Sequence, residues 1–409
     1  MPATSFPKNK IRIVLAENIH PYASALLKKE GYTSVESIKG APDAKWLNEN
    51  AGSIHLLGIR SKTFLNAEFF EKAKRLISAG CFCIGTNQVD MNAAIRNGVA
   101  VFNSPYSNTR SVAELVIAHC IHLLRKIPSR NFNMHHGKWD KSSTGCHELR
   151  GKIIGIVGYG HIGSQVSVLA EALGMKVVFY DLIPKLILGN ARQCKTLDEL
   201  LALADIVTLH IPGSAANKNV INSQRLKKMK KHSILINLSR GDVVDLNALK
   251  SALKENHLSG AAIDVFPYEP QTNNEIFTCP LQGMDNVILT PHIGGSTEEA
   301  QEQIAADVTA KMLNLLETGN STGSLSIPEI ALPVQLHTHR LLHIHQNTPG
   351  VLGEINSRLS EKKINILGQY LNTNAHIGYV ALDMDKKFSG RALEELKKVK
   401  GTIRVRTLY

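Results

Sequence analysis

Residues 153–163 read IIGIVGYGHIG and place a glycine-rich turn directly after an apolar run. The apolar residues that begin it are typical of a strand buried inside a parallel sheet. In a turn of this spacing, Gly158 permits the tight bend, Gly160 lets a pyrophosphate approach the backbone, and Gly163 permits close packing of helix on strand. The stretch therefore predicts a buried strand, a phosphate-binding turn and a helix over 161–173.

The start of this helix and the end of the next strand add groups suited to a dinucleotide. His161 and Ile162 begin the helix, where N–H groups and the positive end of the helix dipole attract phosphates. Asp181 follows the predicted strand 176–180, close to the ~20 residues expected before an acidic residue that binds ribose hydroxyls. A carboxylate there repels a 2′-phosphate, and residues 182–184 contain no arginine, so NAD is favoured over NADP. The alternative interpretation of Asp181 is an aspartate that only caps a turn.

Composition and charge exclude several other classes of protein. The chain has 409 residues, of which 43% are hydrophobic, so two or three domains are expected. No apolar stretch reaches the roughly 18–20 residues of a membrane span, and the N-terminus lacks the apolar core of a signal peptide. We therefore expect a cytoplasmic protein whose six cysteines are reduced thiols.

The net charge of +12 favours anionic ligands without indicating nucleic acid. The basic residues are dispersed, and the longest basic run, 227–231, is interpreted as the solvated face of an amphipathic helix. The 17 histidines contain no metal-ligand pattern such as HExxH. We expect a small anionic substrate and a dinucleotide, and no metal, membrane or nucleic acid.

Strand-like and helix-like segments alternate along most of the chain, which indicates an α/β protein. A first block contains apolar runs at 11–15, 54–59 and 98–102. Residues 111–114, Ser-Val-Ala-Glu, resemble a capping box at the start of a long helix. A doubly wound sheet follows. Its strands after the glycine turn are expected at 176–180, 205–210, 233–237, 260–264 and 286–290.

The C-terminal part has a different pattern. Residues 318–336, after a predicted helix over 297–317, are rich in Gly, Ser and Pro and are expected to form a linker. Beyond it the order βαββαβ predicts a small ferredoxin-like module that serves as a binding domain. Its strands are expected at 338–345, 366–373, 377–384 and 402–408, and its helices at 350–362 and 390–399.

Three residues near predicted strand ends supply groups for hydride and proton transfer. His292 follows strand 286–290, where open α/β sheets place their sites, and histidine exchanges a proton near neutral pH. Glu269 is suited to orient this imidazole, and Arg240 is suited to bind a substrate carboxylate. Taken singly, each residue is better explained without chemistry, Arg240 as a surface ion pair, Glu269 as a turn acid and His292 as a packed loop histidine.

The motifs around these residues resemble the D-2-hydroxyacid dehydrogenase family. The stretches that carry the resemblance are 236–245, 262–266 and 289–292. The resemblance implies that Arg240, Glu269 and His292 form the catalytic set. It implies further that Asp264 contacts the nicotinamide carboxamide and that Leu238, Ser239 and Arg240 lie along the cofactor. Leu238 is a departure, because a smaller residue is common there.

The family also implies a division into domains. A discontinuous, flavodoxin-like substrate domain is expected to contain 1–108 and 296–336, and the Rossmann domain to contain 109–295. The C-terminal domain, 337–409, resembles an ACT domain through residues 343–352. Gly294 and Gly295 are then expected beside the cofactor and at a hinge whose closure expels water.

Within the family, stretches 80–90 and 107–114 closely resemble the branch that carries an ACT domain and oxidises 3-phosphoglycerate as the first step of serine synthesis. This substrate needs cations for its phosphate besides Arg240. The expected substrate-binding residues are Arg60, Ser61, Lys62, Asn108, Lys39 and Lys141. L-Serine is the implied effector, bound by His345, Asn347 and Asn365, and a homotetramer is the implied assembly. Residues 334–339 lack the glycine hinge familiar at the junction with the ACT domain.

Two other functions stay open from the sequence. The same chemistry serves a reductase of hydroxypyruvate, glyoxylate or 2-oxoglutarate. A non-catalytic, NAD-sensing interaction protein is the other alternative, although such a protein need not keep Arg240, Glu269 and His292 together.

Overall fold

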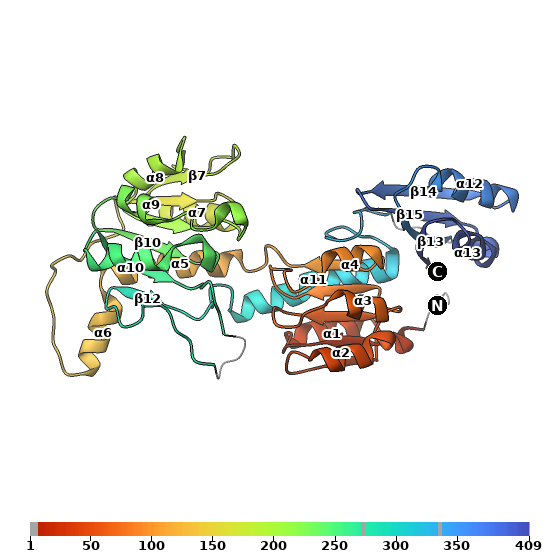
Figure 1. Ribbon diagram of the computed structural model, residues 1–409, viewed down its shortest axis with the longest axis horizontal. Coiled ribbons are helices and arrows are strands. Elements are labelled where there is room, and N and C mark those ends of the chain that lie inside the picture. The colour runs from red at the N-terminus through yellow and green to blue at the C-terminus, as the bar shows by residue number, and fades with distance from the viewer. Residues whose placement is uncertain (1–6, 271–274, 334–337, 409) are drawn as a thin grey trace. The chain divides into compact units, whose positions relative to one another are not determined.

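The computed structural model describes residues 7–270, 275–333 and 338–408 (Figure 1). The chain forms two compact units. One is built from the chain up to Ser107 and from Gln301 onward, and the other from Asn108–Ala300. The first unit therefore contains both the N-terminal block and the C-terminal module.

The N-terminal block is a parallel sheet of flavodoxin-like strand order, as the sequence predicted. The order β2-β1-β3-β4-β5 places the sheet's switch point between β1 and β3. The strands are β1 Ile13–Leu15, β2 Val35–Ser37, β3 Leu56–Ile59, β4 Ser78–Cys81 and β5 Ala100–Asn103. The helices are α1 Pro21–Lys29, α2 Ala44–Asn50, α3 Ala67–Lys72, α4 Met91–Arg96 and the long α11 Glu298–Thr318. The sequence pattern missed β2, which is polar and half exposed, and β4, whose residues Ser-Ala-Gly-Cys have low strand propensity.

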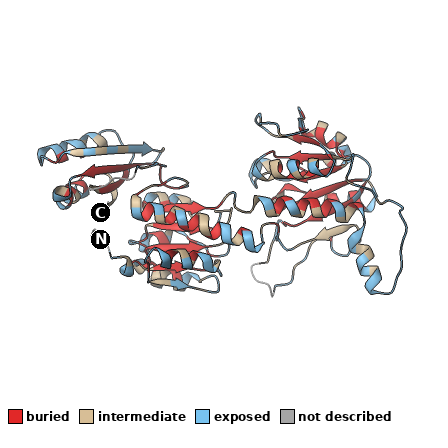
Figure 2. Cartoon of the chain, turned by 180° about the vertical axis from the view of Figure 1, so that it is seen from behind, coloured by how far each residue is buried: buried red, intermediate tan, exposed pale blue. Residues whose placement is uncertain are grey.

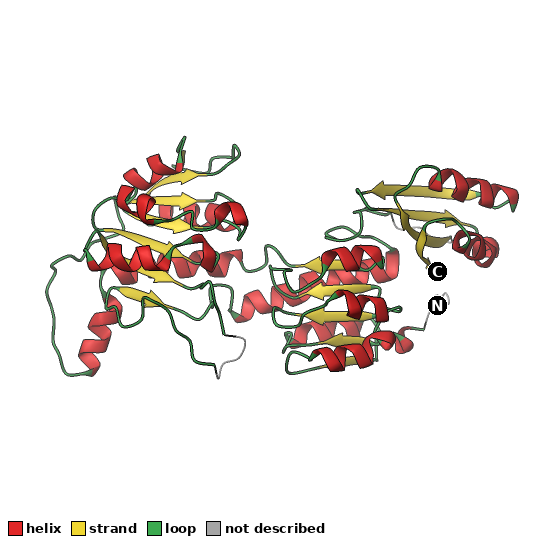
Figure 3. Cartoon of the chain, in the orientation of Figure 1, coloured by secondary structure: helices red, strands yellow, loops and turns green. Residues whose placement is uncertain are grey.

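The second unit is the predicted doubly wound Rossmann sheet, of order β12-β11-β10-β9-β6-β7-β8. Its strands are β6 Ile153–Val157, β7 Lys176–Tyr180, β8 Arg192–Gln193, β9 Ile206–Leu209, β10 Ser233–Asn237, β11 Leu258–Ile263 and β12 Val287–Leu289. Its helices are α5 Thr109–Leu124, α6 Ile127–His135, α7 His161–Ala172, α8 Leu197–Leu203, α9 Ser223–Lys228 and α10 Leu246–Lys254. The strands between the edge strands β12 and β8 are largely buried, and the helices show exposed outer faces, because apolar clusters fill both sides of the sheet (Figures 2 and 3).

The C-terminal module has the predicted ferredoxin-like order, β14-β15-β13-β16, with antiparallel pairing throughout. Its strands are β13 His339–Gln346, β14 Ile366–Thr373, β15 Ile377–Met384 and β16 Thr402–Leu408, and its helices are α12 Val351–Glu361 and α13 Ser389–Lys397. One face of this sheet packs on α12 and α13. The other face shares a core cluster with the N-terminal block through Leu342, Ile344 and Tyr379.

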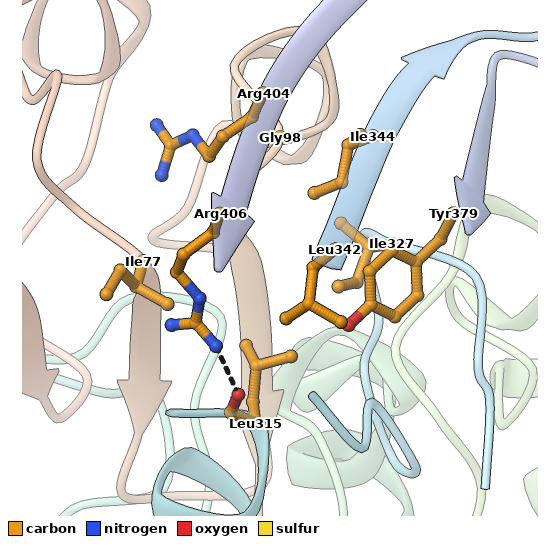
Figure 4. A pocket seen from close by; sticks show the side chains of 9 residues that line it. All are labelled: Ile77, Gly98, Leu315, Ile327, Leu342, Ile344, Tyr379, Arg404 and Arg406. Carbon is orange, nitrogen blue, oxygen red and sulfur yellow. Dashed lines mark hydrogen bonds between the residues drawn. The ribbon is translucent and has the colours of Figure 1, made fainter. Parts of the chain in front are cut away.

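A small cavity lies at this contact within the first unit (Figure 4). Arg404 and Arg406 on β16 line it beside Ile77 and Leu315. Arg406 donates to the carbonyl oxygen of Leu315 at 2.6 Å, in the last turn of α11, and Arg404 donates to the carbonyl oxygen of Leu76. A cation at a helix C-terminus is favourable, so Arg406 stabilises the end of α11.

Three local predictions were wrong. Ser111 is not the N-cap of α5, since Asn108 holds that position and Ser111 Oγ lies 2.9 Å from Thr297 Oγ1. Residues 318–333 are not a loose linker, because buried Ser326 accepts from Val101 N and donates to Val99 O. The helix α9 ends at Lys228, short of most of the basic run. The glycine-free stretch that follows the linker falls largely on 334–337, outside the described residues.

Candidate active site

The glycine turn after β6 has the geometry that a bound pyrophosphate requires. Gly158 has φ +92°, and a Cβ there would lie 2.4 Å from the carbonyl oxygen of His210. A Cβ on Gly163 would lie 2.2 Å from the carbonyl oxygen of Gly158. A Cβ on Gly160 would meet nothing within 4 Å, so this side of the turn is open. Gly158 and Gly163 therefore serve the turn and the helix packing as predicted, and α7 begins at His161 beside them. The approach of a pyrophosphate at Gly160 stays a prediction.

Asp181 at the end of β7 joins this turn. Its Oδ2 accepts from Tyr159 N at 2.9 Å, and its Oδ1 accepts from Ile183 N at 3.3 Å. Lys185 Nζ lies 3.9 Å from the same carboxylate, a cation that the sequence reasoning missed. The carboxylate is thus held beside the phosphate turn, where a ribose is expected, and its contact with ribose stays a prediction.

His292 and Glu269 form a close pair. His292 Nδ1 lies 2.8 Å from Glu269 Oε2, and Glu269 Oε1 accepts from Phe266 N at 3.0 Å. The neutral imidazole donates from Nδ1 to the carboxylate, so Nε2 is its proton-accepting atom. His292 has φ 54°, a left-handed conformation that costs energy in a residue with a side chain.

The two groups shift each other's pKa in opposite directions. The hydrogen bond that His292 donates to Glu269 raises the pKa of His292 above its ordinary value, against the effect of burial, and the charges of Glu269 and Asp264 add to this. Burial would raise the pKa of Glu269, but hydrogen bonds from His292 and Phe266 N and the charge of Arg240 lower it. Glu269 therefore stays ionised and stabilises the protonated imidazole.

Arg240 is presented by a turn that Asn237 holds. Asn237 Oδ1 accepts from Ser239 N at 3.1 Å and Ser239 Oγ at 2.8 Å, and its Nδ2 donates to Arg240 O at 2.9 Å. Arg240 Nη1 donates to Ser239 O at 2.7 Å. The sequence reasoning missed Asn237, although an asparagine at the end of β10 is a recognisable signal for such a turn.

Asp264 anchors the loop that carries His292. Its side chain is buried, with 1% of the residue exposed. Oδ1 accepts from Thr290 Oγ1 at 2.6 Å and Ile293 N at 2.8 Å, and Oδ2 accepts from Gly294 N at 2.9 Å. The residue thus holds the loop of His292, and the expected contact with a nicotinamide carboxamide stays a prediction.

The remaining residues predicted around the cofactor pack closely in the second unit. Leu238 is buried in a core cluster, and a Cβ on Gly294 would lie 3.6 Å from its Cδ2. A Cβ on Gly295 would lie 2.2 Å from Asn108 Nδ2. Asn108, the first residue of this unit, therefore lies close to Gly295 near the end of the unit. The hinge at these two glycines stays a prediction.

The predicted substrate and effector residues are distributed over both units. Arg60, Ser61, Lys62 and Lys39 belong to the first unit, whereas Asn108 and the exposed Lys141 belong to the second with the catalytic set. In the C-terminal module, buried His345 Nδ1 lies 2.8 Å from Gln346 O, and Asn347 donates to Asn374 O at 2.8 Å. Asn365 is exposed just before β14. Their roles in binding substrate and effector stay predictions.

The comparisons with known proteins agree with this site. Residues 117–294 match the NAD-binding domain of D-isomer specific 2-hydroxyacid dehydrogenases, and 341–404 match an ACT domain like that of the AHAS small subunit. The D-3-phosphoglycerate dehydrogenase of Haemophilus influenzae is 51% identical over 99% of both chains. This chain belongs to the D-3-phosphoglycerate dehydrogenase family. The namesake enzymes of Escherichia coli and Dictyostelium discoideum are 49% and 48% identical over the full length of both chains.

Solved structures confirm the fold of the N-terminal block and of the Rossmann unit. A D-2-hydroxyisocaproate dehydrogenase superposes with a TM-score of 0.72 at 26% identity, covering 77% of this chain and all of that one. A D-lactate dehydrogenase from Aquifex aeolicus, complexed with NAD and lactic acid, gives 0.67 at 25% identity over 78% of this chain and all of that one. The chain is therefore an NAD-dependent oxidoreductase. Within the described ranges, no helix is long and apolar enough to cross a membrane.

Proposed function

We propose that the chain oxidises 3-phosphoglycerate to 3-phosphohydroxypyruvate with NAD, the first step of serine synthesis. The observation that carries the proposal is the His292–Glu269 pair at 2.8 Å beside Arg240, in a chain about half identical to phosphoglycerate dehydrogenases along its whole length. Family and geometry favour this reaction over a non-catalytic role, because a binding protein has no use for a carboxylate-oriented histidine.

The residues divide the reaction between them. NAD held at the glycine turn and Asp181 would supply the acceptor for the hydride from C2 of the substrate. His292 Nε2 accepts the proton of the C2 hydroxyl, and Glu269 stabilises the imidazolium that forms. Arg240 binds the substrate carboxylate and polarises the carbonyl that develops at C2. Lys39, Arg60 and Lys62 supply charge for the phosphate, and Asn108, Ser61 and Lys141 complete the proposed set.

A spectrophotometric assay of NADH formation tests this function. Purified protein with NAD is expected to produce NADH from 3-phosphoglycerate. The panel includes D-lactate, D-glycerate and 2-hydroxyglutarate, with 3-phosphohydroxypyruvate, hydroxypyruvate, glyoxylate and 2-oxoglutarate in the reverse direction. Turnover confined to the unphosphorylated compounds would assign a different substrate, and no turnover with any of them would favour the NAD-sensing role.

L-Serine is the proposed effector of the C-terminal module, and a cytoplasmic homotetramer is the proposed form of the enzyme. The ACT match and the amide and imidazole groups of His345, Asn347 and Asn365 support serine, since they suit an amino acid's charged ends. Serine is expected to lower turnover by a coupling of about 1–3 kcal/mol. Turnover that does not change at millimolar serine would exclude the effector, and sedimentation velocity measures the assembly.

A further inference from the structure

The loop that carries Arg60 and Lys62 is built around one buried carboxylate. Glu17, the second residue after β1, is 8% exposed. Its Oε1 accepts from Arg60 N at 3.0 Å and Thr63 N at 2.9 Å, and its Oε2 accepts from Lys62 N at 2.9 Å. Three backbone N–H groups converging on one point form a site for an anion, and here the chain's own carboxylate fills it.

The backbone of Glu17 reaches a second loop. Glu17 N donates to Gly40 O at 3.0 Å, and Asn18 N donates to Ile38 O at 3.3 Å. Lys39 lies between these two acceptors. Glu17 therefore joins the loops after β1, β2 and β3, which are neighbouring strands of one sheet.

The conformation at Glu17 is strained, which shows that the arrangement is held by its contacts. Glu17 and Asn18 both adopt left-handed backbone conformations, with φ 61° and 51°. Such residues cost of order 1–3 kcal/mol each and persist where the surroundings determine them.

Gln88 fixes the same loop from the opposite side. Gln88 Nε2 donates to Arg60 O at 2.5 Å and to Gly85 O at 3.3 Å. Both the N–H and the C=O of Arg60 are thereby taken by side chains of other loops. Among the described residues, neither Arg60 nor Lys62 has a carboxylate within ion-pair distance, so both cations remain available to a ligand.

The position of this loop is one where open α/β sheets bind ligands. In the order β2-β1-β3-β4-β5 the switch point lies between β1 and β3. Glu17 is the second residue after β1, and Arg60 is the first after β3. We propose that Glu17 is the positioning residue of the substrate phosphate site, holding Arg60, Lys62 and Lys39 so that they bind the phosphate together. This inference rests on the proposed function, since it takes 3-phosphoglycerate as the ligand.

The variant Glu17→Gln tests the inference. Glutamine keeps the size but offers one acceptor oxygen and turns an NH₂ group toward backbone donors. Charge-assisted hydrogen bonds are strong, so the KM for 3-phosphoglycerate is expected to rise about tenfold or more. The KM for NAD and the kcat are expected to stay within about twofold, because the catalytic set lies in the other unit. Preference for 3-phosphoglycerate over D-glycerate, measured as the ratio of kcat/KM values, is expected to fall by the same factor.

Glu49→Gln is the matched control, since Glu49 is exposed in the same unit and, within the described part of the chain, forms no ion pair or hydrogen bond with these loops. It removes the same charge and is expected to leave all constants unchanged. Glu17→Asp keeps the charge and is expected to restore part of the preference for the phosphorylated substrate. Thermal unfolding of each variant separates loss of positioning from loss of folding.

The outcomes are distinct. A Glu17→Gln enzyme whose KM for 3-phosphoglycerate stays within twofold of wild type overturns the inference, as does an equal loss with D-glycerate. If this variant does not fold, Gln88→Leu replaces it, with an expected rise of about threefold in the same KM for the loss of a neutral hydrogen bond. No change in Gln88→Leu would then overturn the inference. A wild-type enzyme that does not oxidise 3-phosphoglycerate refutes the proposed function itself. The wild-type assay alone shows this result, so the two failures are distinguishable.

Discussion

Two loops of this molecule are held by the same device and carry different chemistry. Asp264, after β11, accepts backbone N–H bonds from the loop after the neighbouring strand β12. Glu17, after β1, accepts them from the loop after the neighbouring strand β3. The first loop presents His292, whose imidazole can exchange a proton, whereas the second presents the cationic side chains of Arg60 and Lys62. A buried carboxylate thus fixes each loop, and under the proposed function the side chains on the loop decide whether it moves a proton or binds a charge.

The largest effect is expected from removing the titratable group. His292→Ala removes the proton acceptor, so kcat should fall about 10²- to 10⁴-fold while substrate binding changes little. Steady-state kinetics with 3-phosphoglycerate and NAD measure it. His232→Ala is the matched control, because His232 is an exposed loop histidine of the same unit that also has a positive φ, 66°. A near-normal kcat in His292→Ala would show that the loop of His292 does not carry the proton acceptor.

Buried histidines that carry no chemistry offer a contrast with His292. Burial lowers the pKa of His119, from 6.5 to about 4, and that of His343 to about 4. Between these pH values the unfolded chain therefore binds more protons than the folded chain. The free energy of unfolding falls as pH drops from about 6.5 toward 4. At 1.36 kcal/mol per unit, each group accounts for roughly 3 kcal/mol over this window.

Urea unfolding of wild type and His119→Leu at pH 7 and pH 5 measures this loss. The variant is expected to lose less stability than wild type on acidification, since neither nitrogen of His119 has a hydrogen-bond partner among the described residues. An equal loss in the two proteins would place the acid sensitivity elsewhere.

Asp264→Asn tests the anchor of the catalytic loop in the way that Glu17→Gln tests the other anchor. Asparagine turns an NH₂ group toward the donors of the loop, and displacement of His292 by about 1 Å can cost about 10²-fold, so we expect kcat/KM to fall about 10- to 100-fold. Asp285→Asn, an exposed carboxylate just before β12, is the control. If the fall appears only in the KM for 3-phosphoglycerate, the two anchors act alike and the comparison fails.

The smallest effect is a shift in pH dependence. Glu269 raises the pKa of His292, so Glu269→Gln should lower that pKa. Oxidation needs neutral His292, and activity is lost as pH falls through its pKa. The acidic limb of kcat/KM for oxidation should therefore move to lower pH in the variant, together with a lower kcat. An acidic limb that stays in place would mean that another group titrates there.

The sequence predicted the elements whose signals are local. The glycine turn, the buried strands and the βαββαβ module follow from runs and spacings that need no knowledge of distant residues. The residues 318–333 were predicted to be a linker because their serines are polar. Ser326 is nevertheless buried, and its hydroxyl bonds the backbone N–H of Val101 and the carbonyl oxygen of Val99 at the start of β5. Strand β2 was missed because its residues are half exposed at the edge of the sheet.

The site was predictable only in part, because some of its contacts join residues that are far apart in the sequence. Arg240, Glu269 and His292 lie in motifs, but the sequence gives no sign that Glu17 receives N–H bonds from residues 43–46 positions away. Asp264 was predicted only as a contact of the nicotinamide carboxamide, and its hydrogen bonds to the loop of His292 were not foreseen. Anchors of this kind depend on which strands become neighbours, and that is settled by the tertiary fold.

The most direct test of the account is the selectivity of the wild-type enzyme. The ratio of kcat/KM for 3-phosphoglycerate to kcat/KM for D-glycerate, both with NAD, measures how much binding of the phosphate raises kcat/KM. In this account the phosphate is bound by the cations of the loop that carries Arg60 and Lys62. We predict that the ratio favours 3-phosphoglycerate by about 10²-fold or more, since charge-assisted hydrogen bonds contribute about 1.5–3 kcal/mol each. A ratio near one would contradict the division of proton transfer and phosphate binding between the two loops.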